Sequence, residues 1–134
     1  MQGLPARAAQ AYVQTHVQSR SPLELVVMLY DGLLRFIGEA QSALVSQDLH
    51  GKREAMSRAL AILSELQSTL NMEHGGDLAQ SLDALYTYIN GRLLEGSLQN
   101  DPLPLDECAR LLRPLREAWS EIAAQDVCAG AHAR

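Results

Sequence analysis

The segment SPLELVVMLYDGLLRFIGEAQSA, residues 21–43, has the pattern of a helix start followed by a long amphipathic helix. Ser21 can cap the helix with its hydroxyl, and Pro22 suits the first helical position because its missing N–H costs nothing there. Glu24 completes a capping box with Ser21. This pattern predicts a helix from residue 21 to about residue 46. Its core face repeats with helical period, at Val26, Leu29, Tyr30, Leu33, Ile37, Ala40 and Leu44.

The same helix carries a second apolar row, roughly a quarter turn away from the core face. Its members are Leu25, Met28 and Phe36, with Gly32 between them. A helix in a small bundle needs only one apolar face. The second row therefore indicates either an unusually wide core or a surface that binds a partner, because monomers rarely expose large apolar patches. Both interpretations also apply to residues beside the later core faces, namely Ile62, Tyr86, Tyr88 and Leu111.

Three further segments repeat apolar residues with helical period, at about 49–72, 77–98 and 104–125. The Gly75-Gly76 pair stops one helix before the next begins, and Pro114 would kink the last helix. The predicted inward residues of these helices include Leu49, Leu78 and Ile122. Four such helices joined by short turns predict an all-α fold, an antiparallel up-and-down four-helix bundle.

The bundle is expected to span residues 21–125, with an N-terminal arm at 1–20 and a flexible tail at 126–134. The arm has only weak periodicity, and its large apolar residues include Tyr12 and Val13. It is therefore either a disordered leader, as many termini are, or an arm that docks Tyr12 and Val13 on an apolar groove.

Composition limits the partners that the chain can have. A formal charge of −5 and a pI near 5.3 argue against binding to nucleic acid or to an anionic membrane surface. No apolar run approaches the roughly 20 residues that span a bilayer, so membrane insertion is not expected. The N-terminus has no segment of the signal-peptide kind. These features predict a cytoplasmic protein, in which Cys108 and Cys128 are unpaired thiols.

No group of residues has the spacing of a catalytic, cofactor or metal site. None of the histidines follows a glutamate by three residues, so the di-iron motif of carboxylate bundles is missing. No glycine-rich phosphate loop is present, and Cys108 falls on an inward face. The sequence therefore predicts a binding protein without enzymatic activity, cofactor or metal, which recognises an amphipathic helix in a groove.

Four glycines lie inside the predicted helices, where each costs about 1 kcal/mol relative to alanine. Such a cost indicates that a neighbouring helix or a partner segment approaches the backbone closely. These glycines are Gly32, Gly38, Gly91 and Gly96.

Three stretches together resemble the flagellar secretion chaperones, the FliS family. They are AYVQTHVQSRSPLELVVMLYDGLLRFIGEA, NMEHGGDLAQSLDALYTYINGRLLEG and LLRPLREAWSEI, and the resemblance covers about residues 9–124. It implies a cytoplasmic chaperone that binds the C-terminal region of new flagellin, prevents its premature polymerisation and helps deliver it to the flagellar type III export apparatus. It also favours a docking arm around Tyr12 that covers part of the site.

The flagellin segment is expected to enter grooves lined by the second apolar row and its neighbours Ile62 and Tyr88. Other flagellar proteins and the export gate remain open as additional partners. The alternative function is a self-associating helical interaction or regulatory protein that uses the same apolar rows.

Overall fold

The computed structural model describes residues 21–72 and 75–132, and side chains up to residue 126. The arm expected at residues 1–20, with Tyr12 and Val13, lies outside the described residues. The described part contains four helices, and all-α architecture is confirmed. They are α2 (Pro22–Val45), α3 (Leu49–Ser68), α4 (Gly76–Gln99) and α5 (Pro102–His132).

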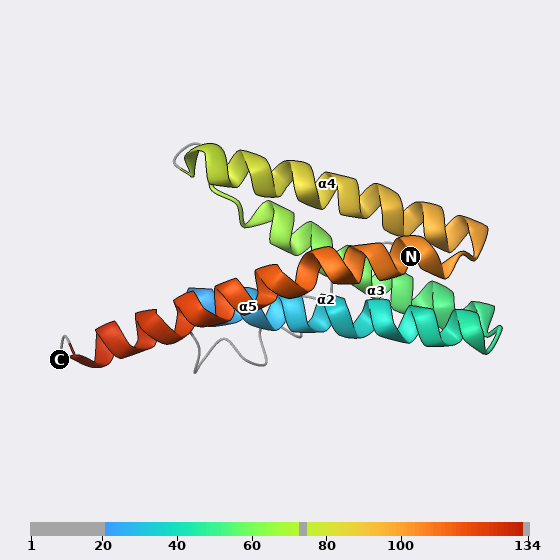
Figure 1. The fold of residues 1–134 in the computed structure, drawn as a ribbon, viewed down its shortest axis with the longest axis horizontal. Helices are drawn as coiled ribbons and strands as arrows, with labels where there is room; N and C mark the ends of the chain where they lie inside the picture. Colours follow the sequence, from blue (N-terminus) through green and yellow to red (C-terminus); the bar gives the residue numbers. More distant parts are fainter. Residues whose placement is uncertain (1–20, 73–74, 133–134) are drawn as a thin grey trace.

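The helices form a bundle in which each one runs back along the one before it (Figure 1). α2 packs against α3 and α5, and α4 packs against the same two helices. Within the described residues, α2 and α4 make no backbone contact, so they lie diagonally across the bundle. The predicted four-helix bundle is therefore confirmed. Figure 1 also shows that α4 lies close to α5 where α5 begins and diverges from α2 and α5 toward its own N-terminus.

Local capping explains where the helices begin and end. The Ser21 hydroxyl accepts a hydrogen bond from the Glu24 backbone N–H at 3.2 Å, as its sequence predicts. The Asp48 carboxylate accepts from the Gly51 backbone N–H at 2.9 Å and caps α3. α4 ends at Gln99 and is capped by Asn100, which has a left-handed φ of 52° and is one of the residue types that tolerate it.

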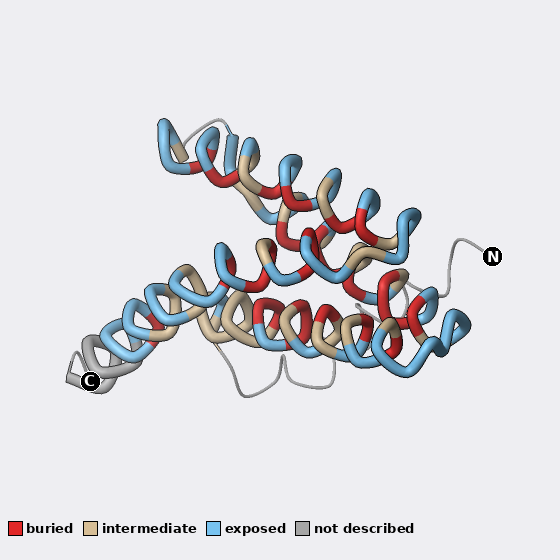
Figure 2. The backbone as a smooth tube through the Cα atoms, turned by 45° about the vertical axis from the view of Figure 1, so that its right-hand side comes forward, coloured by how far each residue is buried: buried red, intermediate tan, exposed pale blue. Residues whose placement is uncertain are grey.

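The core occupies the inward sides of all four helices, as the buried segments in Figure 2 show. The expectation that Ile62 and Tyr86 lie beside the core is wrong, because they are 2% and 1% exposed. Gly32 is also buried. α3 and α4 each pack against two neighbours, which widens the face that they bury.

Three predicted inward residues are instead exposed, and this expectation is wrong. Leu49, Leu78 and Ile122 are 47%, 63% and 45% exposed. Leu49 is the first residue of α3, at an end of the bundle. Leu78 belongs to the first turn of α4, where this helix has diverged from α2 and α5 (Figure 1). Helical period alone cannot report such divergence, because it describes one helix at a time.

α5 passes through Pro114 and continues to His132, beyond the predicted end near residue 125. Residues 126–132 are therefore helical, where the sequence indicated a loose tail. Pro114 is exposed, so the carbonyl that loses its helical N–H partner can bond to water.

Polar side chains fix the helices relative to one another. The Arg116 guanidinium on α5 donates to Asp31 on α2 at 2.7 Å. Gln67 on α3 donates to Asp83 on α4, also at 2.7 Å. Such partly exposed contacts contribute little stability individually, but they favour one register of the helices.

Lys52 on α3 is the one charged side chain that is buried among the described residues, at 8% exposed. Its ammonium donates to the Ser97 carbonyl at 2.8 Å, near the C-terminus of α4, where the helix dipole favours a cation. We expect Lys52→Met to lower the free energy of unfolding by about 1–2 kcal/mol, because it leaves this carbonyl without the charged donor. Urea unfolding measures the change.

The matched control is Arg53→Met, since Arg53 is the exposed neighbour of Lys52 on the same helix. This change is expected to stay within about 0.5 kcal/mol of the unmodified protein. Equal losses for both variants would contradict the role assigned to the Lys52 contact.

Candidate partner-binding groove

An apolar groove of about 430 Å³ opens at the end of the bundle where α2 and α4 begin and α3 ends. This end is where Figure 1 shows α4 diverging from α2 and α5. We refer to it as the open-end groove. Its lining comes from all four helices and the turn between α3 and α4: Pro22, Leu23, Leu25, Val26, Leu29, Glu65, Leu66, Thr69, Leu70, Asn71, Gly75, Leu78, Ala79, Leu82, Tyr86 and Trp119.

The floor of the open-end groove is part of the hydrophobic core. Leu29, Leu66, Leu82 and Tyr86 all belong to the buried core cluster, yet they also line the groove. Leu78 stands at the groove with most of its side chain exposed. The interior of the bundle is therefore not closed at this end, and an apolar side chain placed there would extend the core. Burying apolar surface contributes roughly 25 cal/mol per Å².

Polar groups are few in the open-end groove. Among the described residues that line it, Glu65 is the only charged one. Below it, the hydroxyls of Tyr30 and Tyr86 lie 2.5 Å apart and share a hydrogen bond. Burial raises the pKa of both tyrosines above the ordinary value, so both hydroxyls stay protonated at physiological pH. An occupant would thus meet a largely apolar surface.

Of the predicted site residues that the structure describes, only Leu25 and Tyr86 line this groove. Met28 and Phe36 are half-buried on α2 and do not line it. The Phe36 ring instead lies below two guanidinium groups, with Arg35 5.0 Å and Arg58 5.7 Å from its centroid. Such contacts are typical cation–π pairs.

Tyr88 and Leu111 belong to a different face, formed by α4 and α5. They are 47% and 38% exposed, respectively. The Tyr88 hydroxyl donates to Glu107 at 2.8 Å, and Arg92 donates to the same carboxylate at 2.6 Å. Hydrogen bonds from Arg92 and Tyr88 hold the pKa of Glu107 below its ordinary value. Ile62 and Gly32 lie in the core, so the predicted set does not form one surface.

Sequence reasoning missed most of the groove. Leu66, Leu70, Leu78 and Leu82 carried the ordinary signal of core residues, yet all four line the groove at the open end of the bundle. Trp119 offered the one distinctive signal. It is the only tryptophan in the chain, and its large apolar body with one N–H donor is typical of binding surfaces.

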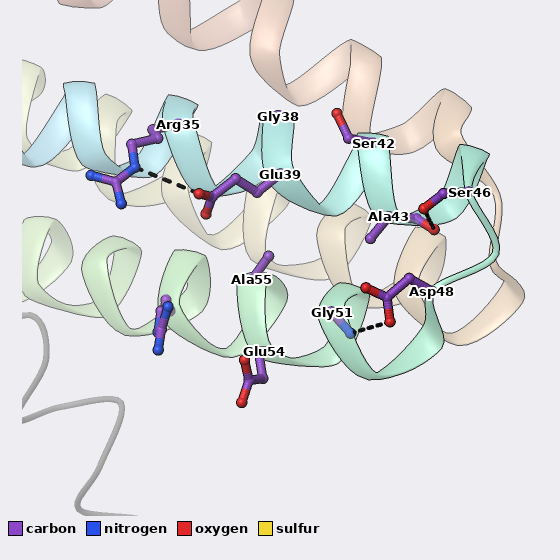
Figure 3. Close-up of a pocket in the computed structure, with 11 residues that line it drawn as sticks. Arg35, Gly38, Glu39, Ser42, Ala43, Ser46, Asp48, Gly51, Glu54 and Ala55 are labelled. Atoms are coloured by element: carbon purple, nitrogen blue, oxygen red, sulfur yellow. Dashed lines mark hydrogen bonds and ion pairs between the residues drawn. The ribbon is translucent and has the colours of Figure 1, made fainter.

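A second hollow of about 700 Å³ lies between the C-terminal half of α2 and the start of α3 (Figure 3). Its floor includes Gly38 and Ala55. Its sides are charged, and Figure 3 shows Arg35 reaching Glu39, with 3.7 Å between the closest atoms. Because charges of both signs surround it and its floor is small, this hollow offers an occupant little apolar burial.

The described residues contain no cluster of histidine, cysteine or acidic side chains arranged to hold a metal ion. Cys108 is a free, buried thiol, and burial raises its pKa to about 12, so it is a poor nucleophile. None of the described helices combines the length and apolar character needed to cross a membrane.

Comparisons with a family model and with individual known proteins point to the same family. A model of the family described as flagellar protein FliS matches residues 5–126. The flagellar secretion chaperone FliS of Salmonella typhimurium is 38% identical over 115 residues, which cover 85% of each chain. The proteins of the same name from Vibrio cholerae and Bacillus subtilis are 33% and 36% identical, covering 84% and 83% of this chain and 86% and 82% of their own.

Proposed function

The chain belongs to the FliS family of flagellar proteins, and from this premise we propose that it is a secretion chaperone for flagellin. In this proposal, the C-terminal segment of flagellin binds the open-end groove, is kept from polymerising too early, and is handed to the flagellar type III export apparatus. The observation that carries the proposal is a groove whose floor is the protein's own core. A bundle that leaves its core open at one end is suited to receive an apolar segment from another chain.

The energetics follow from a guest segment that is disordered alone and folds on binding. Ordering such a segment costs roughly 2–5 kcal/mol of the gross interaction energy. Each buried leucine-sized or valine-sized side chain returns about 1.5–3 kcal/mol. Several such side chains in the open-end groove therefore suffice, and they are then unavailable for contacts between flagellin subunits.

We also propose that the N-terminal arm occupies the groove before the guest arrives. The arm, residues 1–20, is followed by Ser21 and then by Pro22 and Leu23, which both line the groove. Residues 1–20 contain no aspartate or glutamate, whereas the one charged residue among the described lining of the groove is Glu65. Tyr12 and Val13 supply the apolar side chains that the guest would displace.

The remaining parts of the proposal concern setting and chemistry. The chaperone acts in the cytoplasm, where flagellin is made, and catalyses no reaction. It binds without a cofactor, because apolar burial supplies the affinity. Other flagellar proteins and the export gate would use surfaces outside the open-end groove.

We expect a peptide of the flagellin C-terminal segment to bind with a stoichiometry of one to one and micromolar or tighter affinity. Because the groove is largely apolar, raising the salt from about 0.1 M to about 0.5 M should change the affinity by less than about threefold, although the Debye length falls to roughly 4 Å. Isothermal titration calorimetry measures both quantities. Absence of binding at micromolar concentrations, or its loss at high salt, would count against the proposal.

Size-exclusion chromatography separates this function from self-association. A chaperone should elute as a complex of one chain with one peptide. A self-associating protein should elute as a dimer whether or not the peptide is present, which would favour the alternative function.

A further inference from the structure

The hydrogen bonds between α4 and α5 lie near the start of α5. The Tyr88 hydroxyl and the Arg92 guanidinium on α4 both donate to the Glu107 carboxylate on α5. The Cys108 thiol donates to the Ile89 carbonyl at 3.8 Å. Beyond these contacts, Figures 1 and 2 show the two helices diverging toward the open end of the bundle. The rest of α5 therefore continues with α4 increasingly far from it.

The side of α5 that faces α4 stays apolar after the helices diverge. Residues three or four apart share one side of a helix, so Leu111 and Leu115 continue the side that carries Glu107. Ala118 and Ile122 extend it by two more turns. Leu111 and Ile122 are both exposed, and Leu115 is only partly buried. This side of α5 is thus directed toward α4 without being covered by it.

α4 has a corresponding side that faces α5. Tyr88 marks it, because its hydroxyl bonds to Glu107, and the residues three, seven and ten positions earlier lie on the same side. They are Leu85, Ser81 and Leu78. Leu78 and Tyr88 are exposed, and Leu85 is only partly buried. Two mostly apolar helix sides therefore face each other where the helices diverge, and monomers rarely leave such surface uncovered.

Both sides are continuous with the open-end groove. Leu78 lines the groove from α4, and Trp119, one turn before Ile122, lines it from α5. Ile122 itself does not line the groove. A segment that occupies the groove therefore meets the uncovered side of α5 as soon as it continues past Trp119. A helix is about 10–12 Å wide with its side chains, so it suits a place between two diverging helices.

We infer that the flagellin segment binds as a helix between α4 and α5 and takes the place of a fifth helix of the bundle. One side of the guest packs on Ile122 and its neighbours on α5, and the opposite side packs on Leu78 and its neighbours on α4. The inference rests on the proposed function and gives the path of the guest beyond the groove.

This path also defines the chemistry of the guest. An ordinary surface helix has one apolar stripe, because it packs on one side only. A helix that lies between two apolar helix sides needs apolar residues on two opposite sides. Leucine-sized and smaller apolar residues, separated by half a turn, are therefore expected along the bound part of the flagellin segment.

The first test compares Ile122→Asp with Ala124→Asp in the full chain, with the flagellin C-terminal peptide as the probe. Ile122→Asp should weaken peptide binding at least about tenfold, because the guest would cover the carboxylate without pairing it. Ala124 is exposed and lies on nearly the opposite side of α5, so Ala124→Asp should bind within about twofold of the unmodified chain. Calorimetry gives the affinities, and thermal unfolding checks that both variants are folded.

The second test does not depend on a destabilising substitution. Photoreactive benzoylphenylalanine replaces Ser81 on α4, Ile122 on α5 or, as the control, Ala124 on α5; all three positions are exposed. The peptide should crosslink to positions 81 and 122 and not to position 124. Mass spectrometry should place the two crosslinks on opposite sides of the peptide helix.

Three results would overturn the inference. The first is a folded Ile122→Asp chain that binds the peptide as tightly as the unmodified chain. The second is a peptide that fails to crosslink at position 81 or at position 122. The third is a crosslink from position 122 to the N-terminal arm or to a second copy of the chain that persists at saturating peptide. Failure of the proposed function is a different result, since the unmodified chain would then not bind the peptide at all.

Discussion

Replacing Leu78 with aspartate weakens binding of the flagellin C-terminal segment by at least about a hundredfold while the bundle stays folded. Leu78 lines the open-end groove and is 63% exposed, so the unbound protein tolerates a carboxylate there. A bound guest would cover that carboxylate without pairing it, and an unpaired buried charge is costly. Calorimetry measures the affinity, and circular dichroism reports the helix content.

The matched control is Leu98→Asp, the same substitution on the same helix. Leu98 is 83% exposed and does not line the groove. It makes the same change in net charge as Leu78→Asp but outside the groove, so it should bind the guest like the unmodified chain. Equal binding by both variants would place the guest elsewhere on the protein.

Replacing Gly96 with alanine lowers the free energy of unfolding by about 2 kcal/mol, within the range for overpacked sites. Gly96 is buried in α4 where α5 begins. A Cβ atom there would lie 2.9 Å from the Asp101 carbonyl oxygen and 2.5 Å from the Leu105 side chain. Asp101 lies in the connecting turn, and its backbone N–H donates a hydrogen bond to the Gly96 carbonyl at 2.9 Å. The Asp101 carbonyl therefore cannot move away from a Cβ at position 96 without disturbing this bond.

Gly91→Ala on the same helix should have the opposite sign. A Cβ at Gly91 would meet nothing within 4 Å, so alanine removes only the helix penalty of glycine and adds up to about 1 kcal/mol of stability. Urea unfolding of the two variants gives the comparison. If Gly96→Ala is as stable as Gly91→Ala, the close approach of α4 and α5 is not a determinant of stability.

The sequence was sufficient for the helices because their signals are local. The hydroxyl of Ser21 and the carboxylate of Asp48 cap helices that begin where these residues predict. The end of α5 was not predictable in the same way, since the helix continues past residue 125 through alanine-rich sequence without a clear stop signal. Pro114 was expected to distort α5, but its exposed position lets the helix continue.

The candidate site was less predictable because it depends on how the helices diverge. Ile62 and Leu78 show the difficulty: the first was expected beside the core and is buried, while the second was expected inside and is exposed. The glycines show it again. At Gly96 the start of α5 comes close to the backbone of α4, whereas a Cβ at Gly91 or Gly38 would meet nothing within 4 Å. The sequence pattern did not distinguish these three glycines. The first distinction depends on helices that are distant along the chain, and the second on the connecting turn and the start of α5, which the pattern of α4 alone does not describe.

Trp119 allows the most direct test of the central claim, that a guest completes the open end of the bundle. It is the chain's only tryptophan and lines the groove, so 5-fluorotryptophan incorporation gives the full chain one ¹⁹F resonance at this site. Titration with the flagellin C-terminal peptide should replace this resonance by a new one, complete at one peptide per chain, even if the guest displaces the arm. Saturable binding by calorimetry with an unchanged Trp119 resonance would contradict the account.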